Sequence, residues 1–161
     1  APSASKSKLN SDCFVRTMEI EIVSAFPIRA RPDVVWEYLD DPRAHGAWLG
    51  TNQKTVLTSP EPVRGGSTFQ VITEAGNLKR MEEGEILLPR PHEEIVVRVQ
   101  QSAGKYTDTR YLLTPHGDIT HLDCTVAFFG RGGVTVWFMG LIARPLFRHS
   151  LVRLRKVAEG T

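Results

Sequence analysis

The sequence predicts an α+β domain in which a curved antiparallel sheet of seven strands wraps around a long C-terminal helix. From residue 53 to residue 129, short segments with strand periodicity alternate with turns rich in glycine and proline. Connections this short favour antiparallel neighbours. Two short helical patterns separate these segments from an earlier strand. A long helical pattern ends the chain, and it is the element large enough to cover one face of the sheet.

Size and composition fit one globular domain. The chain has 161 residues, 41% hydrophobic and 24% charged, and its net charge of +2 gives no electrostatic reason to expect nucleic-acid binding. We expect residues 1–16 to form a disordered leader and residues 17–161 to form the single domain. No apolar run resembles a signal peptide or is long enough to cross a bilayer, so we expect a cytoplasmic protein. A monomer and a homodimer both stay open.

The residues with metal or redox chemistry are scattered along the sequence. Cys13 and Cys124 are too few for a disulfide framework, and we expect both to be free thiols. Neither these cysteines nor the five histidines have partners at metal-ligand spacing. The sequence also lacks a phosphate-binding glycine loop and a nucleophile elbow. We therefore expect neither a metal nor a cofactor.

The N-terminal part of the domain is predicted to be one strand followed by two short helices. The strand covers 18–28, where apolar residues alternate with glutamates. Pro32 opens the first helix, because proline suits the first helical turn. Pro42 ends that helix and starts the second, which extends to about Trp48.

Six further segments complete the predicted sheet. They cover 53–59, 67–74, 78–88, 94–101, 106–114 and 119–129. Alternation predicts which side chains of each segment face the covered side of the sheet. The fourth strand of the sheet, 78–88, stays ambiguous. A bulge at Gly84 would decide whether Arg80 and Glu82 point inward or outward.

The final helix, predicted over 133–158, has two different halves. Its first half is apolar almost all round, whereas its second half carries a narrow apolar stripe that includes Phe147 and Leu151. At about 100° per residue the two apolar faces are nearly opposite, and Pro145 between them should kink the axis. We therefore expect the first half to line the mouth of a cavity, with Gly140 allowing close approach, and the second half to grip the sheet.

The end of the chain is basic. The cationic residues there are Arg144, Arg148, Arg153, Arg155 and Lys156, against the single acid Glu159. Two interpretations stay open. These residues form a solvated face that complements the negative end of the helix dipole, or they make a weak contact with an anionic membrane surface.

Four groups of residues together resemble a known family. They are 30–42 with Trp48 after it, 63–69, 83–89, and 113–120 with 154–156. They resemble the first-helix signature, the glycine turn into a strand, the following strand and bend, and the closing strands and helix of the START/Bet v 1-like (SRPBCC) superfamily. The polyketide cyclase/dehydratase-type bacterial members are the most similar. The resemblance spans 18–158 and implies a helix-grip fold that binds apolar ligands such as lipids, sterols, polyketides or plant hormones.

A curved sheet closed by a helix leaves space between them, so we expect a small hydrophobic ligand in that cavity. The candidate ligand-binding residues come from strand parity, from the apolar half of the final helix and, for Trp48, from the end of the second short helix. They are Trp48, Phe69, Val71, Val97, Thr109, Tyr111, Leu113, Cys124, Val126, Phe128, Trp137, Phe138 and Leu141.

Catalysis is a second hypothesis, because the resemblance implies that some members are cyclases, dehydratases or aromatases. The weak candidates for acid/base chemistry are Arg80, Glu82, Tyr111 and His45. An exposed charged strand also accounts for Arg80 and Glu82, and core packing also accounts for Tyr111. A third hypothesis is a non-catalytic protein that contacts a partner or a membrane surface through its basic C-terminal helix.

Overall fold

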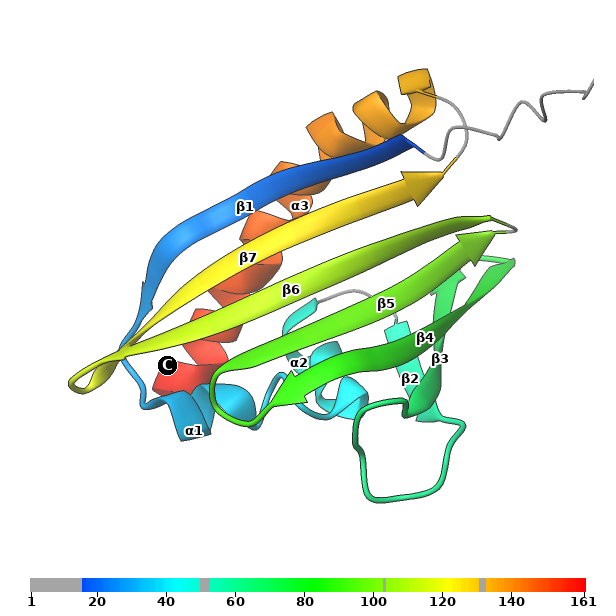
Figure 1. Ribbon diagram of the computed structural model, residues 1–161. Helices are drawn as coiled ribbons and strands as arrows, with labels where there is room; N and C mark the ends of the chain where they lie inside the picture. The colour runs from blue at the N-terminus through cyan, green and yellow to red at the C-terminus, as the bar shows by residue number, and fades with distance from the viewer. Residues whose placement is uncertain (1–15, 50–52, 103, 131–132) are drawn as a thin grey trace, which may run out of the picture.

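The computed structural model describes residues 16–49, 53–102, 104–130 and 133–161. Within them, seven antiparallel strands form one sheet in the order β1-β7-β6-β5-β4-β3-β2 (Figure 1). The strands are β1 (Arg16–Ile28), β2 (Gln53–Leu57), β3 (Thr68–Ala75), β4 (Leu78–Arg90), β5 (Glu94–Ser102), β6 (Lys105–His116) and β7 (Ile119–Gly130). The helices are α1 (Pro32–Trp36), the 3-10 helix η1 (Pro42–His45), α2 (Gly46–Leu49) and α3 (Gly133–Glu159). The predicted α+β class and strand order along the chain are confirmed.

Helix α3 runs behind the sheet in Figure 1, and its C-terminal end lies beside α1. The hydroxyl of Tyr38, just after α1, donates to the carbonyl of Val157 at 3.4 Å. Ser150 donates to the carbonyl of Leu49 at 3.3 Å, which ties α3 to α2 as well. The short helices therefore hold the C-terminal half of α3 against one end of the sheet.

Two predictions fall partly outside the described residues. Cys13 and all but the last residue of the predicted leader lie there, so the leader stays a prediction.

The second predicted helix is divided, since η1 ends at His45 and α2 begins at Gly46. No helix among the described residues is both long enough and apolar enough to span a membrane.

The curvature of the sheet comes partly from irregular pairing in β1. Its register against β7 shifts on both sides of Val23, and Ala25 has a positive φ of 48°. Such bulges bend a strand and increase its twist. The carboxylate of Asp123 accepts a hydrogen bond from the backbone N–H of Ala25 at 2.9 Å, which stabilises the irregular segment. The bend lets β1 follow α3 along one side (Figure 1).

The register of β4 is regular through Gly84. Phe69 pairs with Gly84 and Val71 pairs with Glu82, and the irregularity against β5 lies further on, between Ile86 and Leu88. Gly84 therefore shares one face of the sheet with Phe69, and Glu82 lies on that same face. The bulge that would have turned Glu82 outward is absent at this position.

Helix α3 buries one continuous face, so the expectation of two differently directed buried faces is wrong. Among the residues of α3 whose burial is described, the buried ones are Gly140, Ala143, Ser150, Leu151, Leu154 and Ala158. A Cβ atom added to Gly140 would lie 2.5 Å from Cδ1 of Ile20 in β1, so the Ile20 side chain packs directly against the helix backbone there. Small residues on the inner side bring the helix against β1. The large side chains of Trp137, Phe138 and Leu141 are left more than half exposed on the outer side.

Candidate ligand-binding cavity

A cavity of about 370 Å³ lies between the sheet and α3. Its volume is near the lower end of the range of about 300–1,000 Å³ that small-molecule sites occupy. The lining residues are His45, Leu49, Gln53, Thr55, Phe69, Val71, Glu82, Val97, Val99, Gln101, Thr107, Thr109, Tyr111, Phe128, Ile142, Ala143, Leu146 and Phe147. The cavity is therefore built from the sheet, the η1–α2 segment and the middle of α3.

The sheet side of the cavity is largely apolar. Val97 and Val99 are two residues apart on β5, so both point to the covered face. Val99 pairs with Thr107 of β6, and Thr107 pairs with Phe128 of β7, so these side chains form one row across the sheet. An apolar ligand placed on this row would remove valine and phenylalanine surface from water.

A threonine hydroxyl in that row has no partner. Thr107 is 6% exposed, and its Oγ1 is the one buried side-chain polar atom within the described residues that forms no hydrogen bond to another protein group. Leaving a buried hydroxyl unpaired costs about 1–3 kcal/mol, so such groups are usually satisfied. Because Thr107 lines the cavity, its hydroxyl is placed to bond a polar group of a ligand.

Further polar side chains lie toward the β3–β4 hairpin. Thr55 pairs with Val71, and Val71 pairs with Glu82, so Thr55 and Glu82 lie on neighbouring sides of one lining residue. Gln53 and Gln101 also contribute to the lining. The cavity therefore combines an apolar row with a polar end.

Glu82 and Arg80 are separated by the cavity rim. Glu82 lines the cavity and its side chain is 15% exposed, whereas the side chain of Arg80 is 61% exposed and does not line it. Arg80 Nη2 lies 2.7 Å from Glu82 Oε1. The two residues thus form an ion pair that reaches from the cavity wall to solvent.

At the opposite end, three aromatic side chains pack in sequence. The ring centroids of His45 and Trp48 are 5.4 Å apart, and those of Trp48 and Tyr111 are 5.9 Å apart at an interplanar angle of 87°. The indole N–H of Trp48 donates to the carbonyl of Tyr38 at 2.9 Å. His45 and Tyr111 reach the cavity lining, whereas Trp48 is fully buried behind them.

The titratable groups at this end are neutral at pH 7. Burial lowers the pKa of His45, against the opposing effects of the Leu39 carbonyl and of Asp41. Its Nε2 lies 3.0 Å from that carbonyl, so Nε2 carries the proton and donates. Burial raises the pKa of Tyr111 well above its usual value and that of Cys124 to about 12. A protonated phenol acts as a hydrogen-bond donor and a protonated thiol as a weak one, and neither acts as a nucleophile.

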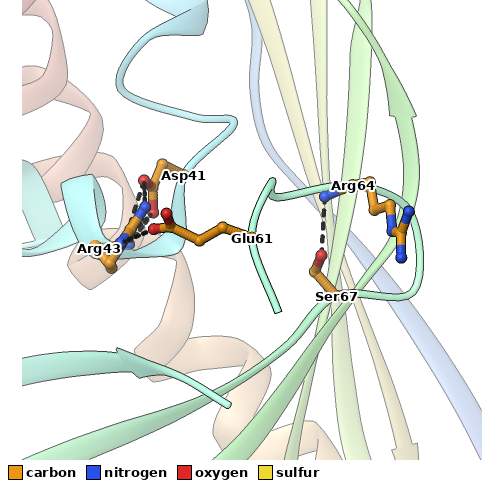
Figure 2. A network of polar contacts seen from close by, with 5 residues as sticks. All are labelled: Asp41, Arg43, Glu61, Arg64 and Ser67. Carbon is orange, nitrogen blue, oxygen red and sulfur yellow. Dashed lines mark hydrogen bonds and ion pairs between the residues drawn. The ribbon is translucent and has the colours of Figure 1, made fainter. Parts of the chain in front are cut away.

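A polar network outside the cavity positions the segment that carries His45. Figure 2 shows the guanidinium of Arg43 between the carboxylates of Asp41 and Glu61, with Nη2–Oδ2 and Nη1–Oε1 distances of 2.8 and 2.6 Å. Glu61 lies in the connection between β2 and β3. Within that connection, the backbone N–H of Arg64 donates to Ser67 Oγ at 2.8 Å. Arg43 therefore links η1 to the β2–β3 connection.

The structure brings half of the residues suggested from the sequence to the cavity. Those that line it are His45, Phe69, Val71, Glu82, Val97, Thr109, Tyr111 and Phe128. Trp48, Leu113, Cys124 and Val126 are buried in the packed core and do not line it. Trp137, Phe138 and Leu141 are exposed on α3 and do not line it either, and Arg80 lies outside the rim.

Several lining residues were missed among the sequence candidates. Val99 and Thr107 share strand parity with chosen neighbours, so alternation alone could have identified them. Gln53, Thr55 and Gln101 are polar, and Gln53 and Gln101 also lie at or next to strand ends, so the apolar alternation did not single them out. Among the described residues, no three His, Cys, Asp or Glu side chains gather into a group that could hold a metal ion.

Comparisons with solved structures show the same fold. The chain is similar to protein CV1439 from Chromobacterium violaceum, with 19% identity, a TM-score of 0.61, and 89% of this chain and 97% of that chain covered. Protein MLL2253 from Mesorhizobium loti gives 18% identity, a TM-score of 0.64 and coverages of 91% and 98%. Ara h 8.0201 gives 10% identity, a TM-score of 0.66 and coverages of 91% and 99%. No curated protein matches the sequence.

The sequence itself also matches a family model, which is described as polyketide cyclase / dehydrase and lipid transport. The match extends over residues 19–159 and so includes the sheet, the short helices and α3. Together with the shared fold, this match shows that the chain belongs to the polyketide cyclase/dehydrase and lipid transport family, within the SRPBCC superfamily.

Proposed function

We propose that the domain binds a small, mainly apolar molecule that carries at least one hydrogen-bonding group. The observation that carries this proposal is the unpaired, buried hydroxyl of Thr107 in the wall of an otherwise largely apolar cavity. The family description, which names polyketides and lipids, supports the same ligand class. A lipid-like or polyketide-like molecule with a carbonyl or hydroxyl group fits both the wall and the polar atom.

Most of the affinity would come from apolar burial. Removing apolar surface from water contributes about 25 cal/mol per Å², before the cost of association is subtracted. Hydrogen bonds to Thr107, Thr109 or the polar end near Glu82 would then fix the orientation of the ligand. A purely aliphatic molecule would leave the Thr107 hydroxyl unpaired and would bind less tightly.

The test begins with the native ligand. Protein purified from its source host is analysed by native mass spectrometry, and any retained molecule is identified. We expect a bound molecule that combines apolar and oxygen-containing parts. An empty protein that also binds no member of a panel of lipids and polyketides would overturn the proposal.

A pair of substitutions on β5 tests whether the ligand binds in the cavity. Val99→Phe adds volume inside the cavity, whereas Val96→Phe adds the same volume on the opposite face of the strand. Both positions are half-buried, so the two variants are matched in burial. We expect Val99→Phe to weaken ligand binding at least about tenfold, or about 1.4 kcal/mol, and Val96→Phe to leave it unchanged. Equal effects would place the ligand elsewhere.

Catalysis is the second candidate, because Glu82 is the one carboxylate among the described lining residues. It is placed to move a proton on a polyketide-like substrate, which is the chemistry of cyclases and dehydratases. Glu82→Gln keeps the size of the side chain and removes the proton acceptor. Loss of turnover with unchanged binding would support an enzyme, whereas unaltered substrate after incubation with the native protein would count against one.

A further inference from the structure

The N-terminal half of α3 presents an apolar patch to solvent. It consists of Trp137, Phe138, Leu141, Ile142 and Leu146, whose exposed fractions are 55%, 57%, 58%, 52% and 62%. The other large apolar side chains that are exposed among the described residues are Val56, Leu78 and Met81, on β2 and at the β3–β4 hairpin. Contiguous apolar surface of this kind is uncommon on a free soluble domain and marks an interaction site.

The described part of the domain leaves this patch uncovered. Gly140 and Ala143 are buried on the inner side of α3, and the side chains of Met18 and Ile20 pack against Gly140, which fixes that orientation. At about 100° per residue, the patch residues centre on a direction nearly opposite to these two. The patch therefore faces outward for as long as α3 grips the sheet.

Basic side chains continue the patch along the same helix. Arg144, Arg148, Arg153 and Lys156 are all exposed. Within the described part of the chain, none of the four forms an ion pair. Glu159, the acid at this end, accepts a hydrogen bond from the backbone N–H of Arg29 at 2.8 Å. These four cations thus have their charge directed to solvent.

The acids of the nearest strand do not offset this charge. Glu19 and Glu21 of β1 are exposed, and they alternate with Met18 and Ile20. Met18 and Ile20 are the residues that contact Gly140, so the two glutamates point to the other face of the sheet. The outward side of α3 is therefore apolar in its first half and cationic in its second.

The patch also borders the cavity. Ile142 and Leu146 are more than half exposed, and both line the cavity. Whatever covers the patch consequently lies beside the cavity opening. If the patch is covered by a surface that contains apolar molecules, those molecules lie next to the cavity opening. They then enter the cavity without passing through water.

We propose that the outward side of α3 docks on the surface of a bilayer that contains anionic lipid. Trp137, Phe138 and Leu141 enter the boundary between head groups and acyl chains, and the arginines contact the phosphates. A helix with an apolar sector and exposed arginines has the composition of such interfacial segments, and tryptophan favours that depth. Charge complementarity favours an anionic lipid surface over an uncharged one. Docking does not depend on what the cavity holds.

The test uses the full chain and two kinds of vesicle, phosphatidylcholine alone and phosphatidylcholine mixed with phosphatidylglycerol. We expect the protein to float with the mixed vesicles, and salt should weaken this binding. Trp36 and Trp48 are buried and Trp137 is exposed, so brominated lipid should quench the emission of Trp137. No flotation with the anionic vesicles at low salt would overturn the proposal.

Three double variants identify the surface. Phe138→Gln with Leu141→Gln should weaken vesicle binding at least about tenfold. Arg144→Gln with Arg148→Gln should reduce binding to mixed vesicles to the level seen with phosphatidylcholine alone. Leu78→Gln with Met81→Gln removes exposed apolar side chains at the β3–β4 hairpin and serves as the matched control, with no change expected.

Two further measurements keep the result unambiguous. Far-ultraviolet circular dichroism should show that every variant keeps the fold, since all substituted residues are exposed. Size-exclusion chromatography tests whether the patch binds a second copy of the chain instead of a bilayer. A dimer that dissociates in the Phe138→Gln/Leu141→Gln variant would show that the patch is a subunit interface and would overturn membrane docking. Ligand binding is measured in solution, so its failure is distinct from failure to dock.

Discussion

The ring of Phe69 lies against the backbone of Gly84 on the neighbouring strand. The two residues are register partners, and a Cβ atom at Gly84 would be 2.2 Å from Cζ of Phe69. Phe69 is 2% exposed and lines the cavity. The missing side chain of Gly84 thus makes room for a ring that forms part of the cavity wall.

Gly84→Ala should therefore change both stability and binding. The new methyl group forces the ring of Phe69 out of its present position, and overpacking of this kind costs about 1–3 kcal/mol. The ring can move toward the cavity, which would reduce the volume available to a ligand. Chemical denaturation measures the first effect, and titration with an identified ligand measures the second.

Gly46→Ala provides the control for this substitution. A Cβ atom at Gly46 would meet its nearest neighbour, the carbonyl oxygen of Gln53, at an ordinary contact distance of 3.6 Å. Gly46 begins α2 with helical dihedral angles, φ −58° and ψ −26°. Alanine favours helix over glycine by up to about 1 kcal/mol, so stability should stay equal or rise slightly. A loss as large as that of Gly84→Ala would mean that steric conflict with Phe69 is not the cause.

The sheet could be predicted well because its pattern is local. In β7, buried Leu122, Cys124, Val126 and Phe128 alternate with half-buried residues, as period-two alternation requires. Turn residues then set the strand limits to within a few positions. Both signals lie within one short segment, so no knowledge of the remaining fold was needed.

The orientation of α3 could not be predicted in this way. A helix that is apolar almost all round carries no periodic signal that tells inside from outside. The inner side is decided by small residues such as Gly140, whose lack of a side chain allows contact with Ile20 of β1. That contact depends on the position of a strand more than a hundred residues earlier in the chain.

The same reasoning explains which cavity residues could be predicted. Strand parity identified the covered face, but it did not separate residues at the cavity from residues in the packed core. Tyr111 lines the cavity, whereas its partner Cys124 does not, although both are buried on the same face. Part of the space under the sheet is filled by side chains from other elements, such as Trp48 of α2, which packs against Tyr111.

Two tryptophan substitutions should have very different costs. Trp48 is fully buried and donates a hydrogen bond to Tyr38, so Trp48→Ala should lower the free energy of unfolding by about 3–5 kcal/mol. Trp137 is 55% exposed, so Trp137→Ala should cost less than about 1 kcal/mol. Urea denaturation of both variants checks the difference. A cost for Trp137→Ala that approaches that of Trp48→Ala would contradict the orientation of α3.

His45 should make the fold less stable in mild acid. Its pKa in the folded protein is lowered from 6.5, chiefly by burial, so between that lowered value and 6.5 the unfolded chain binds more protons than the folded one. The free energy of unfolding therefore falls as pH drops through this window, by at most about 1.4 kcal/mol per pH unit. Urea denaturation at a series of pH values from about 7.5 downward measures this slope.

His45→Gln is the matched variant for the pH series. Glutamine does not titrate, so the difference between the two proteins isolates His45 from the other four histidines. We expect the variant to be less stable near neutral pH, through loss of packing against Trp48, but to show a shallower decline below about pH 6.5. Parallel curves for the two proteins would show that His45 remains protonatable in the fold.

Thr107→Val should separate the stability of the free domain from its affinity for a ligand. Valine has nearly the same shape as threonine, so the substitution removes the unpaired Oγ1 without leaving a cavity. The free protein should be at least as stable as the parent, with a gain of at most about 1–3 kcal/mol where the hydroxyl has no water partner in the empty cavity. A ligand that bonds this hydroxyl should bind the variant about tenfold less tightly, which calorimetric titration measures.

Thr125→Val, at a half-buried position on the other face of β7, should alter neither quantity by more than about 0.5 kcal/mol. A stabilised variant with unchanged affinity would show that the Thr107 hydroxyl does not contact the ligand.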